Sequence, residues 1–180
     1  DLKPKVITEY NIEGNPIPKF MDLVLKVKPT QVTLVPDDIN QITSNAGWDT
    51  VAHLSYLKEV ISEFKNAGIR TSIFIDTDLK LIEAAAKTGA DRIELYTEYF
   101  ASEYDKGNEK AIKPYTQASI LAHELGLGIN AGHDLSLNNI EFFKQNISNL
   151  AEVSIGHALI SESLYLGLQN VVNMYLHRLQ

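Results

Sequence analysis

Two short segments of the chain end an apolar run with a glycine followed by a histidine. The first is Asn130-Ala131-Gly132-His133-Asp134, and the second is Ser154-Ile155-Gly156-His157-Ala158. A histidine at the exit of a buried strand can exchange protons near neutral pH, and a neighbouring glycine leaves backbone N–H groups open to a phosphate. This repeated pattern near the C-terminus indicates the phosphate-binding end of a β/α barrel enzyme.

The composition excludes several other kinds of chemistry. The chain has 180 residues, of which 44% are hydrophobic, so we expect a single domain over residues 1–180. It has no cysteine, which excludes disulfides, thiolate catalysis and cysteine-ligated metals. A net charge of −7 argues against a nucleic-acid or anionic-membrane surface, although a phosphorylated small substrate remains compatible with it. No apolar run approaches the roughly 20 residues that a membrane span needs.

Short apolar runs alternate with segments of helical periodicity along the whole sequence. We expect strands at residues 6–10, 32–35, 71–75, 92–96, 127–131 and 153–155. Helical spacing predicts helices at 20–27, 51–64, 79–88, 114–125 and 137–146, and the polar stretch 102–110 is typical of a long loop. Six such strand–helix units imply parallel strands with crossover helices.

Two folds are compatible with six such units. An open nucleotide-binding sheet needs Gly-x-Gly-x-x-Gly after its first strand, and this chain has none. A closed barrel typically needs about 250 residues. The sequence therefore predicts an α/β fold, a (β/α)8 TIM barrel with six of its eight βα units in this chain. We expect two further units upstream of Asp1.

Three residues are candidates for acid–base chemistry. Glu9 ends the first predicted strand, on the rim where barrel enzymes place catalytic groups, although a solvated or ion-paired glutamate is an alternative. Glu94 interrupts an apolar strand and should point into the barrel, either as a functional carboxylate or as the partner of a buried cation. His133 could likewise be an ordinary packed or rim histidine.

Five motifs together resemble one enzyme family. They are Gln31-Val32-Thr33-Leu34-Val35-Pro36, Ser72-Ile73-Phe74-Ile75-Asp76, Ile93-Glu94-Leu95-Tyr96-Thr97, Asn130-Ala131-Gly132-His133 and Ile155-Gly156-His157-Ala158. In order and spacing they resemble the pyridoxine 5′-phosphate synthase family of vitamin B6 biosynthesis. The resemblance implies condensation of 3-amino-2-oxopropyl phosphate with 1-deoxy-D-xylulose 5-phosphate, releasing phosphate and water. It also implies a cytoplasmic homo-octamer that uses no metal and no organic cofactor.

The resemblance assigns catalytic roles to the three acid–base candidates. Glu9 matches a general base, Glu94 a glutamate that stabilises developing charge, and His133 a proton donor. From the residues alone, each structural alternative stays open.

The same resemblance assigns substrate-binding roles. Gly156 and His157 match the site for the aminoketone phosphate, for which a simple turn is the alternative, and Thr43 matches a contact to the deoxyxylulose phosphate. Asp134 stands where the family commonly has glycine; its carboxylate would have to turn away from a phosphate, while its backbone N–H could still serve. The segments 37–40 and 44–49 also depart from the family pattern.

Two other functions remain possible from the residues. The chain could be a non-catalytic barrel fragment that only binds phosphate. It could also be another phosphosugar barrel enzyme, but an aldolase would need a lysine at a strand end for a Schiff base, and Lys5 lies at the start of its predicted strand.

Overall fold

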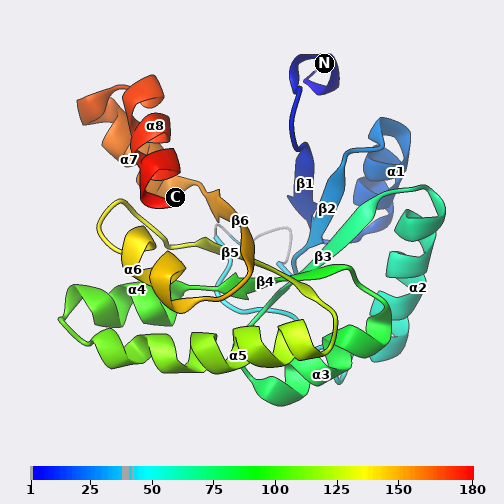
Figure 1. Ribbon diagram of the computed structural model, residues 1–180. Coiled ribbons are helices and arrows are strands. Elements are labelled where there is room, and N and C mark those ends of the chain that lie inside the picture. The colour runs from blue at the N-terminus through cyan, green and yellow to red at the C-terminus, as the bar shows by residue number, and fades with distance from the viewer. Residues whose placement is uncertain (1, 38–40, 42) are drawn as a thin grey trace.

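The computed structural model describes residues 2–37, 41 and 43–180 of the chain. It contains a sheet of six parallel strands in which each strand pairs with the next along the chain (Figure 1). The strands are β1 (Asn11–Gly14), β2 (Gln31–Leu34), β3 (Arg70–Ile75), β4 (Arg92–Tyr96), β5 (Gly128–His133) and β6 (Leu150–Ile155). Residues 38–40 of the divergent segment 37–40 lie outside the described part.

The helices between the strands cover the outer face of the sheet, and two more follow the last strand (Figure 1). They are α1 (Pro18–Val27), α2 (Leu54–Asn66), α3 (Leu79–Thr88), α4 (Glu98–Asp105), α5 (Lys113–Glu124), α6 (Ile140–Asn146), α7 (His157–Leu166) and α8 (Leu168–Arg178), with short 3-10 turns η1 (Lys3–Lys5) and η2 (Glu109–Ile112). In the described ranges, no helix combines the length and the apolar character needed to cross a membrane.

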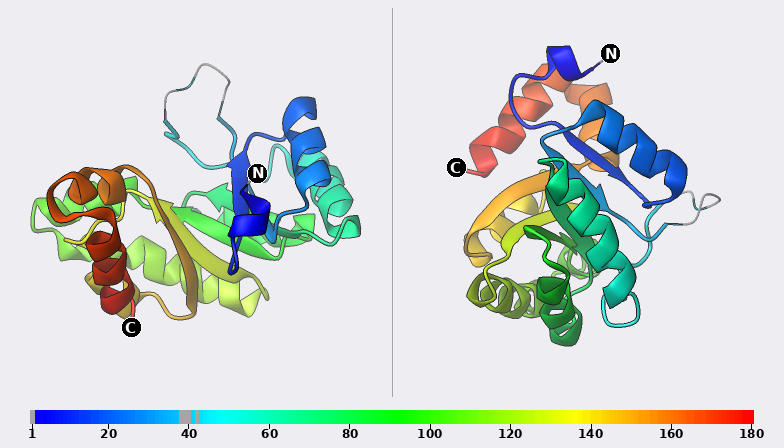
Figure 2. Two further views of the ribbon diagram at one scale, coloured as in Figure 1. Left: turned by 90° about the horizontal axis from the view of Figure 1, so that it is seen from above. Right: turned by 90° about the vertical axis from the view of Figure 1, so that its right-hand side faces the viewer.

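The sheet curves strongly, so that distant strands meet across its inner face (Figure 2). Gln31 in β2 donates to Glu152 in β6 at 3.3 Å, although 121 residues separate them. Arg92 in β4 donates to the same Glu152 at 3.0 Å and to Asn130 at 3.1 Å, and Arg70 in β3 donates to Gln31 at 2.8 Å. This polar network fills the inner face at the strand starts, which leaves the opposite, carboxyl end open for a site.

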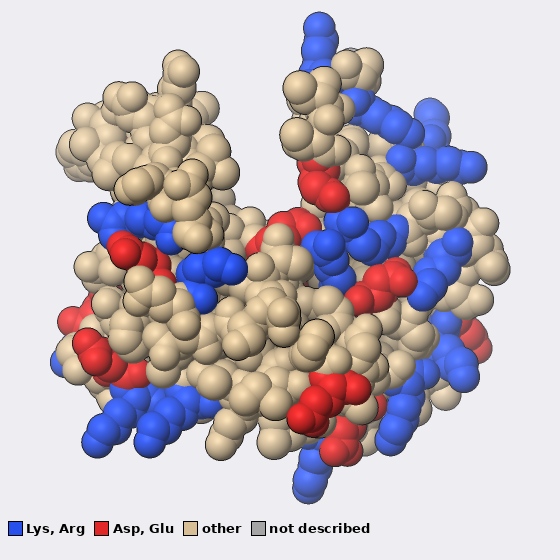
Figure 3. All heavy atoms as spheres, in the orientation of Figure 1, with Lys and Arg blue, Asp and Glu red and all other residues tan. Residues whose placement is uncertain are grey.

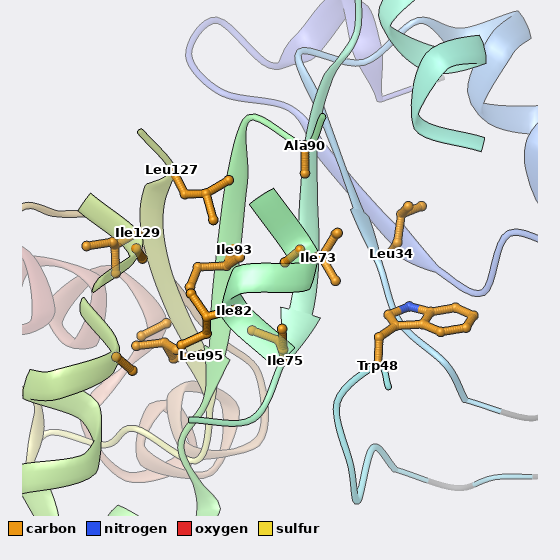
Figure 4. Close-up of a cluster of buried hydrophobic side chains, with 14 of the residues drawn as sticks. Leu34, Trp48, Ile73, Ile75, Ile82, Ala90, Ile93, Leu95, Leu127 and Ile129 are labelled. Atoms are coloured by element: carbon orange, nitrogen blue, oxygen red, sulfur yellow. The ribbon is translucent and has the colours of Figure 1, made fainter. Parts of the chain in front are cut away.

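The apolar core lies between the outer face of the sheet and the helices (Figure 4). Strand residues such as Ile73, Ile93 and Leu95 are fully buried there, and Ile82 of α3 packs against the same cluster. Burial of each such side chain contributes about 1.5–3 kcal/mol relative to exposure, so this layer holds the strand ends in fixed positions.

The first strand is not where the sequence pattern predicted it. Residues 6–10 do not form a strand; η1 precedes them and β1 begins at Asn11. Ile7, an apolar residue of the predicted strand, is 95% exposed. The apolar and β-branched character of this run was misleading, because the pairing strand instead presents the polar residues Asn11 and Glu13.

The predicted loop at 102–110 is also wrong. Helix α4 runs through Asp105, and η2 follows after the turn at Gly107, whose φ is +81°. Phe100 and Tyr104, one helical turn apart, bring their rings to 5.4 Å and anchor the apolar face of α4. Of the polar residues that indicated a loop, Asp105 and Lys106 are exposed.

Beside the edges of the sheet the surface is hollowed (Figure 3). A notch on this face separates the α7–α8 pair from the segment before β1. Strands β1 and β6 each have a single partner strand within the described ranges.

Candidate active site

A cavity of about 420 Å³ lies at the carboxyl ends of the strands. Glu13 enters it from β1, Glu94 from β4 and His133 from β5, and Gly156 and His157 border it between β6 and α7. Parallel strands end on the same side of a barrel, so residues up to 144 positions apart (Glu13 to His157) share one pocket. Of the three predicted acid–base residues, Glu94 and His133 are brought together and Glu9 is not.

Glu94 is a carboxyl group held in the interior. It is 1% exposed, and Thr33 of β2 donates a hydrogen bond to its Oε2 at 3.5 Å. Burial raises the pKa of Glu94 well above its usual value, and the negative charges of Glu13 and Glu152 raise it further. Both effects favour the protonated form of Glu94, which can donate a hydrogen bond.

Glu13 is the second carboxyl group of the pocket. Burial raises its pKa, the neighbouring His133 lowers it, and Asp37 raises it. The charge of Glu13 also raises the pKa of Glu94. Two neighbouring carboxyl groups of this kind favour a state in which one is protonated and the other ionised. Such a pair can supply an acid and a base to the same substrate.

His133 ends β5 in an unusual backbone conformation, with φ at +90°. Its Nδ1 lies 2.8 Å from Asp134 Oδ2, and its Nε2 lies 2.8 Å from Thr43 Oγ1. The hydrogen bond to Asp134 is the main cause that raises the pKa of His133. A non-glycine residue at positive φ is strained, and such strain is concentrated at functional sites.

The loop after β2 reaches into the pocket. Thr43 is a hydrogen-bond partner of His133, although 90 residues separate the two in sequence. Asp37 accepts a hydrogen bond from Ser44 and lines the same cavity. The structure thus brings the predicted Thr43 to the predicted His133.

Gly156 and His157 form the start of α7. His157 is the first helical residue, and no side chain caps this helix end. A Cβ added to Gly156 would meet no atom within 4 Å, so the backbone is open on that side. Free N–H groups and the helix dipole make such an end suitable for an anion.

The predicted position of Glu9 is wrong. Glu9 precedes β1, and its carboxylate pairs with Arg70 at the start of β3, the end of the sheet opposite to His133. This is the ion-paired alternative noted above. The strand-end glutamate is Glu13, four residues later, which sequence reasoning missed. The alternation of Asn11, Ile12 and Glu13 before Gly14 was the signal that could have found it.

Asp134 is oriented by two contacts. Its carboxylate faces His133, which agrees with the expectation that it turns away from a bound phosphate. Its backbone N–H donates to Thr97 Oγ1 at 3.2 Å. The N–H that we expected to serve a substrate is therefore engaged within the protein.

No cluster of three or more histidine, aspartate or glutamate side chains suited to a metal ion occurs in residues 2–37, 41 and 43–180.

Comparison with known proteins identifies the family. The family described as "Pyridoxal phosphate biosynthesis protein PdxJ" matches residues 1–180. Pyridoxine 5′-phosphate synthase of Flavobacterium johnsoniae is 70% identical over 180 residues, covering 100% of this chain and 76% of that protein. The chain belongs to the pyridoxine 5′-phosphate synthase family. The synthase of Christiangramia forsetii is 66% identical over the same length and with the same coverage.

Solved structures support the fold of this family member. Dihydrodipicolinate synthase superimposes with a TM-score of 0.62 at 12% identity, covering 95% of this chain and 61% of that chain. Phosphoribosylanthranilate isomerase from Thermotoga maritima gives 0.58 at 12% identity, covering 99% and 75%. At this identity the likeness concerns the fold alone. The predicted (β/α)8 barrel architecture, with six βα units in this chain, is confirmed.

Proposed function

We propose that the pocket is the ring-closing active site of a pyridoxine 5′-phosphate synthase. The reaction would join 3-amino-2-oxopropyl phosphate to 1-deoxy-D-xylulose 5-phosphate and release phosphate and water. Linking an amine to a ketone and closing a ring removes protons from nitrogen and carbon and delivers protons to leaving oxygens. The observation that carries the proposal is the convergence of Glu13, Glu94 and His133 on one cavity of suitable volume.

Each of the three side chains has a role in this proposal. Glu13 takes the general-base role that the resemblance assigned to Glu9, because Glu13 lines the pocket and Glu9 does not. His133 donates a proton to the leaving hydroxyl or phosphate, a role favoured by its raised pKa. Glu94, buried beneath them, stabilises charge as the ring forms.

The phosphate groups would bind at two places on the rim. The backbone at Gly156 and His157 would hold the aminoketone phosphate at the start of α7, with the side chain of His157 beside it. Thr43, next to His133, would contact the deoxyxylulose phosphate. No metal or organic cofactor takes part in this proposal.

An aldolase of the Schiff-base type is not favoured. The described residues that line the cavity include no lysine, and Lys5 belongs to η1, ahead of the sheet.

The test is formation of pyridoxine 5′-phosphate by the complete gene product supplied with both substrates. We expect product by mass spectrometry, with one phosphate released per product molecule. His133→Gln should lose at least 10²-fold in turnover, as expected for removal of a positioned acid. His123→Gln, an exposed position on α5, is the matched control and should retain activity. A folded wild-type protein that forms no product would contradict the proposal.

The family resemblance also carries a proposal about assembly and location, namely a cytoplasmic homo-octamer. Light scattering on the complete gene product should give eight times the mass of its chain, and cell fractionation should recover it with cytoplasmic markers. A monomeric mass at micromolar concentration would contradict the octamer.

A further inference from the structure

His133 is held between two side chains that contact its two ring nitrogens. On one side, the carboxylate oxygen Oδ2 of Asp134 lies 2.8 Å from Nδ1. On the other, Thr43 Oγ1 lies 2.8 Å from Nε2. An ionised carboxylate can only accept a hydrogen bond, so Nδ1 must carry the hydrogen. In the neutral ring, Nε2 is then the nitrogen without a proton, and Thr43 donates to it.

The segment that carries this pair is fixed from behind by Thr97. This residue is fully buried at the end of β4, and its hydroxyl donates to the carbonyl oxygen of Gly132 at 2.6 Å. The hydroxyl oxygen of Thr97 in turn accepts a hydrogen bond from the backbone N–H of Asp134 at 3.2 Å. One side chain thus clamps the backbone on both sides of His133, where φ is +90°. The clamp aims the carboxylate of Asp134 at the ring and not into the cavity.

We propose that Asp134 is a positioning residue that fixes the tautomer and ring orientation of His133, so that Nε2 alone exchanges protons with the substrate. This deepens the proposed function, on which its catalytic consequence rests. In this proposal Asp134 acts through His133 and makes no direct contact with the substrate. A carboxylate that orients an imidazole in this way selects one tautomer and stabilises the imidazolium that forms during catalysis.

Other charged and titratable groups also face His133. Glu13 from β1 and Asp37 from the loop after β2 are negative, and both raise its pKa less than Asp134 does. Tyr96 of β4 contacts the ring edge-on with centroids 5.5 Å apart, and the ring of His157 lies 6.5 Å away. Asp134 differs from these groups because it hydrogen-bonds to Nδ1.

The direction of the pH effect follows from this arrangement. Asp134 raises the pKa of His133, so it keeps the imidazolium populated to higher pH. Removing the carboxylate should lower that pKa and move the alkaline limb of kcat/KM to lower pH. The loss of activity should therefore be larger at pH 8 than at pH 6.

The test is nitrogen NMR of the histidine rings in the complete gene product, with His133 assigned from the spectrum of His133→Gln. We expect the wild-type neutral ring to carry its proton on Nδ1. Asp134→Ala should give a mixture of tautomers and a lower pKa, and Asp134→Asn a lower pKa. Asp37→Asn is the matched control, since it removes a nearby negative charge without a hydrogen bond to the ring, and its tautomer should stay as in the wild type.

Two outcomes would overturn the proposal. One is a ring in Asp134→Ala with the wild-type tautomer and titration. The other is an equal change in Asp37→Asn, which would mean that charge alone acts. The spectra can be recorded without turnover, so they test the positioning role separately from the proposed function. If the tautomer changes as expected but the wild-type protein forms no product, the positioning role is supported and the proposed function is contradicted. A variant that loses activity equally at pH 6 and pH 8 would contradict the catalytic consequence.

Discussion

Gly132 occupies the point where the backbone of β5 passes closest to the buried carboxyl group. A Cβ added there would lie 2.5 Å from Glu94 Oε1 and 2.7 Å from the carbonyl oxygen of Ser154 in β6. The backbone conformation of Gly132 itself suits any residue, because its φ is not positive. The substitution Gly132→Ala therefore tests steric contact with Glu94 and not backbone strain.

The expected cost follows from these contacts. Overpacking a closely packed interior costs about 1–3 kcal/mol, and replacing glycine by alanine recovers up to about 1 kcal/mol through the unfolded chain. A net loss of about 1–2 kcal/mol lowers the Tm of a chain of this size by about 2–8 °C. Because the Ser154 carbonyl belongs to the backbone, the Glu94 carboxylate must move, and a shift of about 1 Å in a catalytic group costs about 10²-fold in turnover.

The assay combines thermal unfolding with kcat for pyridoxine 5′-phosphate formation. Gly68→Ala is the control: nothing lies within 4 Å of its added Cβ, but its φ is +77°. It should lose about 1–2 kcal/mol through backbone strain and keep its turnover. A Gly132→Ala protein with wild-type Tm and turnover would refute the placement of Glu94 against β5. An equal loss of turnover in Gly68→Ala would show that general destabilisation is the cause.

Two further predictions concern the surroundings of this site. Thr97→Val keeps the shape of the side chain but leaves the Gly132 carbonyl and the Asp134 N–H without their partner. It should lower the free energy of unfolding, measured by chemical denaturation, by about 1–3 kcal/mol and change kcat more than KM. A wild-type kcat would contradict the clamp. For Glu94, a folded-state pKa above the ordinary 4.5 means that its contribution to stability is present at low pH and is lost as pH rises. Calorimetry should therefore show Glu94→Gln gaining Tm relative to wild type between pH 5 and pH 8, while its turnover falls; a pH-independent difference would count against the raised pKa.

The elements with strong apolar patterns were predictable from the sequence. Strand 92–96 and helix 79–88 have the predicted bounds, and Asp78 caps that helix by accepting from the N–H of Lys80. These elements pack on the core through most of their residues, so local pattern and tertiary environment agree.

The first strand was not predictable in the same way. Only Ile12 of Asn11–Gly14 is a large apolar residue, because Asn11 donates to Thr33 of β2 and Glu13 lines the cavity. Strands that carry functional groups into a barrel lose the apolar pattern that identifies strands. The error made Glu9 the strand-end glutamate in place of Glu13.

The contacts within the site depend on tertiary structure. The hydrogen bond between Thr43 and His133 joins segments 90 residues apart, and the ring orientation depends on the clamp by Thr97. The resemblance in motifs indicated Glu94 and His133, which line one cavity, but it also indicated Glu9, which lies elsewhere. It gave no sign that the Asp134 carboxylate faces the ring.

The most direct measurement of the central claim is pyridoxine 5′-phosphate formation by the complete gene product and by two variants. Each variant replaces one glutamate in or just before β1. Glu13→Gln removes the carboxylate that lines the cavity, and Glu9→Gln removes the one paired with Arg70 at the far end of the sheet. We predict product from the wild-type protein and from Glu9→Gln, with a stability cost below about 1 kcal/mol for the latter, and a loss of at least 10²-fold in Glu13→Gln. Absence of product from the folded wild-type protein, or loss of product in Glu9→Gln with Glu13→Gln active, would contradict the account.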